Sequence, residues 1–154
     1  MHEDQVGDDE VLFRCVRRAY VKVENGALRI SSLAFTDPEL EISVDRADLC
    51  SHDPKHTQRS QEDYVCTLMT HAVRAIEDVR RMGKDGKTVV QQHVVLVEPK
   101  PEKEDAEKGV KENPAHAVIR ADPQIANDRV FRRLQDALTR LASWEKGIAP
   151  ATPN

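Results

Sequence analysis

The chain has 154 residues, a net charge of −4 and 32% charged residues, which favours one soluble domain with a single hydrophobic core. The net negative charge argues against a dedicated nucleic-acid binder, because neutralising phosphates requires a basic surface. No apolar run approaches the roughly 20 residues that span a bilayer, so we expect no membrane partner. Residues 1–10 are acidic and do not resemble a signal peptide. We therefore expect a cytoplasmic location and reduced cysteines.

In chain order, the predicted domain covers residues 11–146, with disordered segments at 1–10 and 147–154. Short apolar runs rich in β-branched residues predict strands up to residue 35. Asn25-Gly26 predicts a tight hairpin turn, because these residues tolerate the positive φ of a type I′ connection. A strand with alternating apolar and polar residues follows at 40–45, and Asp45 is expected to cap a helical turn at 46–49.

Residues 61–82 are predicted to form a long amphipathic helix after a polar loop at 51–60. Its apolar residues recur at three- and four-residue spacings, which is typical of one buried helix face. Gly83 is expected to be its C-terminal cap. The members of the apolar face are Val65, Leu68, Met69, Ala72, Val73, Ile76 and Val79.

Two neighbouring strands are predicted at 94–97 and 117–119, separated by a charged loop at 98–112 that we expect to be mobile. The first strand should end at Pro99, which lacks a backbone donor. A second amphipathic helix follows Pro123, with Asn127 or Asp128 as alternative caps. The whole pattern predicts an α+β fold: a mostly antiparallel sheet of five or six strands, with two amphipathic helices packed on one face.

The candidate site residues are His116, Asp45, Arg14, Ser31 and Ser43. His116 follows an Asn-Pro turn, where it could act as a general acid or base in a pocket. The alternative is that its ring binds a backbone carbonyl and fixes the start of the strand. Asp45 and Asp48 could share one side of a helical turn and bind a hard cation or a basic group, or Asp45 could cap the turn while Arg46 pairs locally.

We expect no metal and no cofactor. Cysteine and histidine residues between 50 and 71 lack a Cys-x2-Cys knuckle, and Cys66 and His71 would diverge on a helix. No phosphate-binding loop or nucleophile elbow is present.

Three phrases, at residues 29–35, 40–49 and 113–121, resemble a set of small uncharacterised bacterial proteins in which an Asn-Pro-Ala-His-Ala phrase follows a Ser-Val-Asp-like phrase. The resemblance implies no established activity. Arg14 on a first strand and serines on a second are also distantly similar to the layout of ADP-ribosyltransferases.

These observations lead to two alternatives. The first is a non-catalytic, accessory protein of bacteria that binds a protein partner encoded nearby, through a sheet edge or a concavity near His116. The second is an enzyme whose pocket is formed by Arg14, Ser31, Ser32, Ser43, Asp45 and His116. It requires these side chains to converge on a common site.

Overall fold

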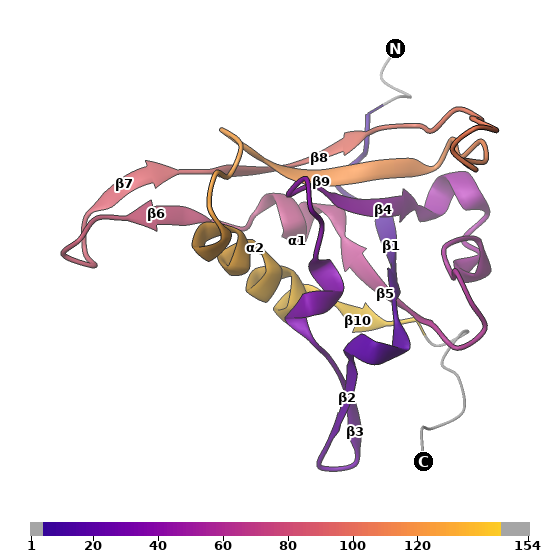
Figure 1. Cartoon of the computed structure of the whole chain (residues 1–154), viewed down its shortest axis with the longest axis horizontal. Helices are drawn as coiled ribbons and strands as arrows, with labels where there is room; N and C mark the ends of the chain where they lie inside the picture. The colour runs from indigo at the N-terminus through magenta and orange to yellow at the C-terminus, as the bar shows by residue number, and fades with distance from the viewer. Residues whose placement is uncertain (1–4, 146–154) are drawn as a thin grey trace.

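A six-stranded antiparallel sheet forms the centre of the computed structural model, which describes residues 5–145 (Figure 1). Its strand order is β10-β5-β1-β4-β9-β8. Every neighbouring pair in this sheet is antiparallel, which confirms the predicted sheet type. The strands are β1 (Val11–Val16), β4 (Ile42–Arg46), β5 (Tyr64–Met69), β8 (Val94–Pro99), β9 (His116–Asp122) and β10 (Ser143–Trp144).

One face of the sheet is covered by α2 (Asp128–Leu141), the predicted C-terminal helix. The Asn127 side chain caps it by accepting a hydrogen bond of 2.9 Å from the Val130 N–H. Of the two predicted caps, Asn127 and Asp128, the cap is thus Asn127. Leu134 and Leu138 of this helix have no exposed surface. They share a core cluster with strand residues that point to the same face: Leu12, Ile42, Leu68 and Ile119. A second, smaller cluster of Phe13, Ala47 and Val65 lies on the other face.

Two separate hairpins extend from this body (Figure 1). The first pairs β2 (Val21–Glu24) with β3 (Ala27–Ile30). Its turn has φ of 51° at Asn25 and 76° at Gly26, which confirms the predicted turn chemistry. The second pairs β6 (Arg80–Met82) with β7 (Val89–Gln92).

The predicted long helix at 61–82 is wrong. This segment instead contains β5, the five-residue helix α1 (Thr70–Arg74) and β6, and Gly83 lies in the β6–β7 loop. The reason lies in the position of β5 between β1 and β10. Val65 is buried on one face and Leu68 on the other, so nearly every residue of the strand is apolar. Apolar residues on both faces of a strand also satisfy a helical spacing. Within residues 5–145 there is therefore one long helix, α2, instead of the two predicted.

The paired strands around residues 94–97 and 117–119 are confirmed as β8 and β9, with Val97 opposite Ile119. β8 lies at the edge of the sheet, and 56% of Val94 is exposed. It ends at Pro99 as expected. In the charged connection, Glu102 bridges Asn113 and Asp105 bridges Val110, so the chain continues the β8–β9 hairpin. Its expected mobility stays a prediction.

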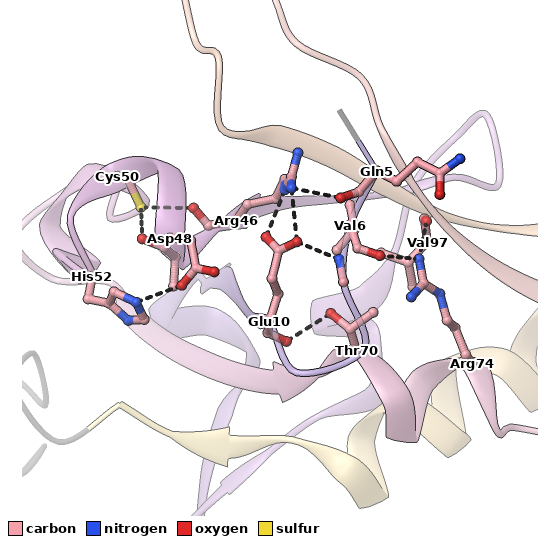
Figure 2. A network of polar contacts seen from close by, with 12 residues as sticks. Gln5, Val6, Glu10, Arg46, Asp48, Cys50, His52, Thr70, Arg74 and Val97 are labelled. Atoms are coloured by element: carbon pink, nitrogen blue, oxygen red, sulfur yellow. Dashed lines mark hydrogen bonds and ion pairs between the residues drawn. The ribbon is translucent and has the colours of Figure 1, made fainter. Parts of the chain in front are cut away.

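Residues 5–10, expected to belong to a disordered acidic terminus, lie across β4 and α1 (Figure 2). Arg46 donates to both carboxylate oxygens of Glu10, at 2.8 and 2.9 Å, and to the Gln5 carbonyl. The side chains of Arg46 and Glu10 are 6% and 7% exposed. The expected local pairing of Arg46 is therefore wrong, because its partner lies far from it in the sequence. The predicted disordered tail at 147–154 falls outside the described residues.

The described part of the chain also contains four short 3-10 helices: η1 (Arg18–Tyr20), η2 (Ser32–Phe35), η3 (Ala47–Cys50) and η4 (Pro54–His56). None of the helices in residues 5–145 has the length and apolar character that crossing a membrane requires.

Candidate functional site

A cavity of about 890 Å³ lies on the face of the sheet opposite α2. Phe13 of β1 and Ser43 and Asp45 of β4 form part of its floor. These residues alternate with Leu12, Ile42 and Val44, which belong to the core under α2. The walls come from η2, from the loop after η4 and from the hairpin tip between β8 and β9. The cavity therefore brings together segments that are far apart in the sequence.

Asp45 is the buried carboxylate of this cavity, with 7% of the residue exposed. One oxygen accepts a hydrogen bond of 2.7 Å from the Thr57 hydroxyl, and the other accepts one of 2.9 Å from the Asn113 side-chain amide. The 3-10 helix that follows has no side-chain cap. The predicted capping role of Asp45 is thus wrong: its carboxylate instead connects β4 to two loops. Asp48 is exposed and contacts His52 at 2.8 Å, so the two carboxylates have different surroundings.

Asn113 links Asp45 to a third segment. Its side-chain oxygen accepts from the Ala115 N–H at 3.1 Å, which identifies that atom as the carbonyl oxygen. His56 Nε2 lies 3.0 Å from the same oxygen and must donate to it. A continuous hydrogen-bonded chain therefore runs from His56 through Asn113 and Asp45 to Thr57.

Arg14 closes the end of the cavity where β1 and β4 diverge. These strands pair only at Leu12–Arg46 and Phe13–Asp45. Beyond that point the Arg14 guanidinium donates to the Ser43 carbonyl at 2.8 Å and to the Ala34 carbonyl at 2.9 Å. It thereby replaces backbone pairing that the two strands do not form. Burial lowers the pKa of Arg14 from its ordinary value, while the side chain stays a cation at neutral pH.

His116 begins β9, opposite Asp45. Its Nδ1 lies 2.7 Å from the Lys100 carbonyl oxygen and therefore carries a proton. This contact is the backbone bond that the structural alternative predicted. In the neutral ring the proton on Nδ1 leaves a lone pair on Nε2, which lies 4.0 Å from a Glu102 carboxylate oxygen. Both residues line the cavity, so His116 can accept a proton or a hydrogen bond there.

The thiols are not set up as nucleophiles. Burial raises the pKa of Cys15, which lines the cavity and contacts Asp63 at 3.6 Å. Burial also raises the pKa of Cys50 to about 11 and that of Cys66 to about 12. Since the thiolate is the reactive form, these cysteines are poor nucleophiles at neutral pH. Among residues 5–145, no group of three or more His, Cys, Asp or Glu side chains is arranged to hold a metal ion.

Four of the five candidate residues line the cavity: Arg14, Ser43, Asp45 and His116. Ser31 does not line it, because its hydroxyl accepts from the Leu33 N–H at 3.3 Å and caps η2. Sequence reasoning missed Thr57 and the role of His56 in the Asp45 network. No local pattern marks Thr57, since its partner is brought to it only by the fold.

No protein-family model, curated protein or solved structure matches this chain. The residues of the cavity are therefore the basis for any functional conclusion.

Proposed function

We propose that the protein is a non-catalytic binding protein that accepts a polar segment of a partner protein in the cavity on the open face of its sheet. The observation that carries this proposal is the preorganised polar floor of the cavity. Arg14, Asp45 and His116 are each held by hydrogen bonds to other parts of the chain. A ligand would thus meet groups that need little reordering, which lowers the entropic cost of binding.

The charges around the cavity favour a peptide as the ligand. The lining includes basic and acidic side chains in nearly equal number: Arg14, Arg17, Arg59, Lys108 and Lys111 against Asp37, Asp45, Glu102 and Glu112. A polyanion such as a nucleic acid would meet repulsion from the acidic side chains. A peptide carries both signs of charge, together with backbone donors and acceptors. The volume of about 890 Å³ falls in the range of ordinary ligand sites.

Catalysis is less well supported by the same geometry. A hydrolytic or transfer mechanism needs a nucleophile hydrogen bonded to a base. Cys15 donates to a carboxylate and has a raised pKa. Both carboxylate oxygens of Asp45 already accept hydrogen bonds, from Thr57 and Asn113.

The test is a selection of peptides against the full-length chain. Random displayed peptides are enriched, and each is titrated by calorimetry against wild type and two charge-reversal variants. Lys111→Glu changes the cavity lining, and Lys22→Glu, on exposed β2, is the matched control. We expect Lys111→Glu to weaken binding about tenfold, which corresponds to about 1.4 kcal/mol, while Lys22→Glu leaves it unchanged. Equal affinities for the two variants, or no enrichment at all, would contradict the proposal.

A second candidate function is an enzyme that uses His116 as a general base. One observation favours it: the proton on Nδ1 is held by the Lys100 carbonyl, so the neutral ring presents Nε2 as an acceptor. Cleavage or modification of an enriched peptide by wild type, lost in His116→Gln, would support the enzyme. Binding without turnover by both proteins would support the binding role.

A further inference from the structure

The β6–β7 hairpin, residues 80–92, projects from the body as a two-stranded arm (Figure 1). In the described part of the chain each of its strands pairs only with the other, and all four residues of β7 are exposed. Val89 and Val90 are 44% and 51% exposed, and Val94 directly beyond the arm is 56% exposed. An isolated two-stranded ribbon is at best marginally stable in water. An arm with exposed valines is therefore a surface that a partner would stabilise.

The arm is basic in an acidic protein. It contains Arg80, Arg81, Lys84 and Lys87 against Asp85 alone, a net charge of +3. The whole chain carries −4, so the remainder carries −7. Asp85 is occupied within the turn, where the Thr88 hydroxyl and the backbone N–H groups of Thr88 and Lys87 donate to its carboxylate. Two arms would repel each other, whereas an arm and the body of another copy would attract.

A groove that complements the arm lies beside its root. It has a volume of about 440 Å³ and runs between α1 and α2. Its walls are mainly apolar, formed by Ala72, Ala75, Ile76, Ala137 and Leu141. Glu77 and Asp78, which precede Val79 and the arm in the sequence, add two carboxylates, and Arg140 also lines the groove, where it donates to Asp78 at 3.2 Å. The groove therefore offers apolar contact for the valines and a net charge of −1, with Glu77 as its second carboxylate, for the basic arm.

We propose that the arm of one copy of this chain docks in the α1–α2 groove of a second copy, and that the second copy returns the same contact. A two-fold dimer requires both halves of the contact to lie on one continuous face of each subunit. Here the arm and the groove adjoin, so one axis beside the arm root brings about both contacts at once. This inference is independent of the cavity on the open face of the sheet.

The proposal is tested by measuring the mass of the full-length protein by sedimentation equilibrium over a series of concentrations. We expect wild type to reach twice the chain mass of 17.4 kDa. Val90→Asp on the arm and Leu141→Lys in the groove should each weaken dimerisation at least about tenfold, as expected for a charge introduced into an interface. The matched control is Val23→Asp, because Val23 is 55% exposed on the other hairpin and should keep the dimer.

Two separate variants keep the proposal falsifiable if one of them folds poorly. Far-ultraviolet circular dichroism checks each variant, and the arm and the groove are probed separately. A wild-type protein that stays at 17.4 kDa throughout would overturn the proposal, even if the arm then bound nucleic acid or another protein. So would a dimer that survives both variants, or one that Val23→Asp weakens as much as Val90→Asp.

Discussion

Replacing Glu10 with Gln should destabilise the protein far more than the same change in an exposed ion pair of equal geometry. Glu10 and Arg46 form a bidentate pair at 2.8 and 2.9 Å with side chains 7% and 6% exposed. Gln keeps the shape of the side chain but removes the negative charge that both Arg46 hydrogen bonds meet in this buried pair. Removing one partner of a buried pair costs about 3–5 kcal/mol, so we expect a loss of that size.

The matched control is Glu98→Gln. Arg120 also donates to both oxygens of Glu98, at 2.8 and 2.9 Å, but these side chains are 33% and 43% exposed. Because water can replace the lost contact, this change should cost no more than about 1 kcal/mol. Urea denaturation followed by the fluorescence of Trp144, the single tryptophan, measures both. Its ring lies 5.1 Å from that of Tyr64 and reports on the packed sheet.

The pH dependence gives an independent check. Burial acts to raise the pKa of Glu10, but hydrogen bonds from Arg46 and the Gly7 N–H and the charges of Arg46 and Arg74 lower it below 4.5 overall. A group with a depressed folded pKa adds stability above its unfolded pKa, and that stability is lost as the pH falls through the folded value. Wild type should therefore lose its advantage over Glu10→Gln below about pH 4.5. Equal losses in Glu10→Gln and Glu98→Gln at neutral pH would refute the reasoning.

Three further predictions concern the core, a turn and the thiols. Leu134→Ala, at a site with no exposed surface under the sheet, should cost about 2–5 kcal/mol in urea denaturation, and a loss below 1 kcal/mol would mean that α2 does not form the core described. Gly26→Ala should cost about 1 kcal/mol by the same assay, because alanine disfavours the φ of +76° at this position. No atom lies within 4 Å of the added Cβ, so the cost comes from backbone strain. Cys66, buried and with a pKa of about 12, should react with maleimide at pH 8 more slowly than Cys50, as followed by mass spectrometry; the reverse order would contradict the burial.

Local chemistry explains the parts of the fold that the sequence predicts well. Asn25-Gly26 specifies a hairpin through its positive φ values, and Asn127 specifies the start of α2 through its side-chain oxygen. Both effects act within a few residues and depend on nothing distant. The β8–β9 pairing is also predictable, because two β-branched runs flank a polar segment in one hairpin.

The failures come from interactions that depend on distant parts of the chain. The sequence of β5 predicts a helix because its residues are apolar on both faces and so also fit a helical spacing. Only the position of β5 between β1 and β10 makes both faces buried. Asp45 reads as a helix cap, yet its partners are Thr57 and Asn113, which the fold brings from two loops. Arg14, Ser43, Asp45 and His116 could be named as candidates from their residue types, but their shared cavity depends on the strand order.

The central claim is that this cavity binds a ligand, and the imidazole signals of the histidines test it most directly. An enriched peptide is added to the full-length protein while the ring resonances are followed by nuclear magnetic resonance. We expect the largest shifts at His116 and His56, which line the cavity, and little change at the exposed His71 or the buried His93. Shifts at His71 with none at His116 would place binding elsewhere and contradict the account.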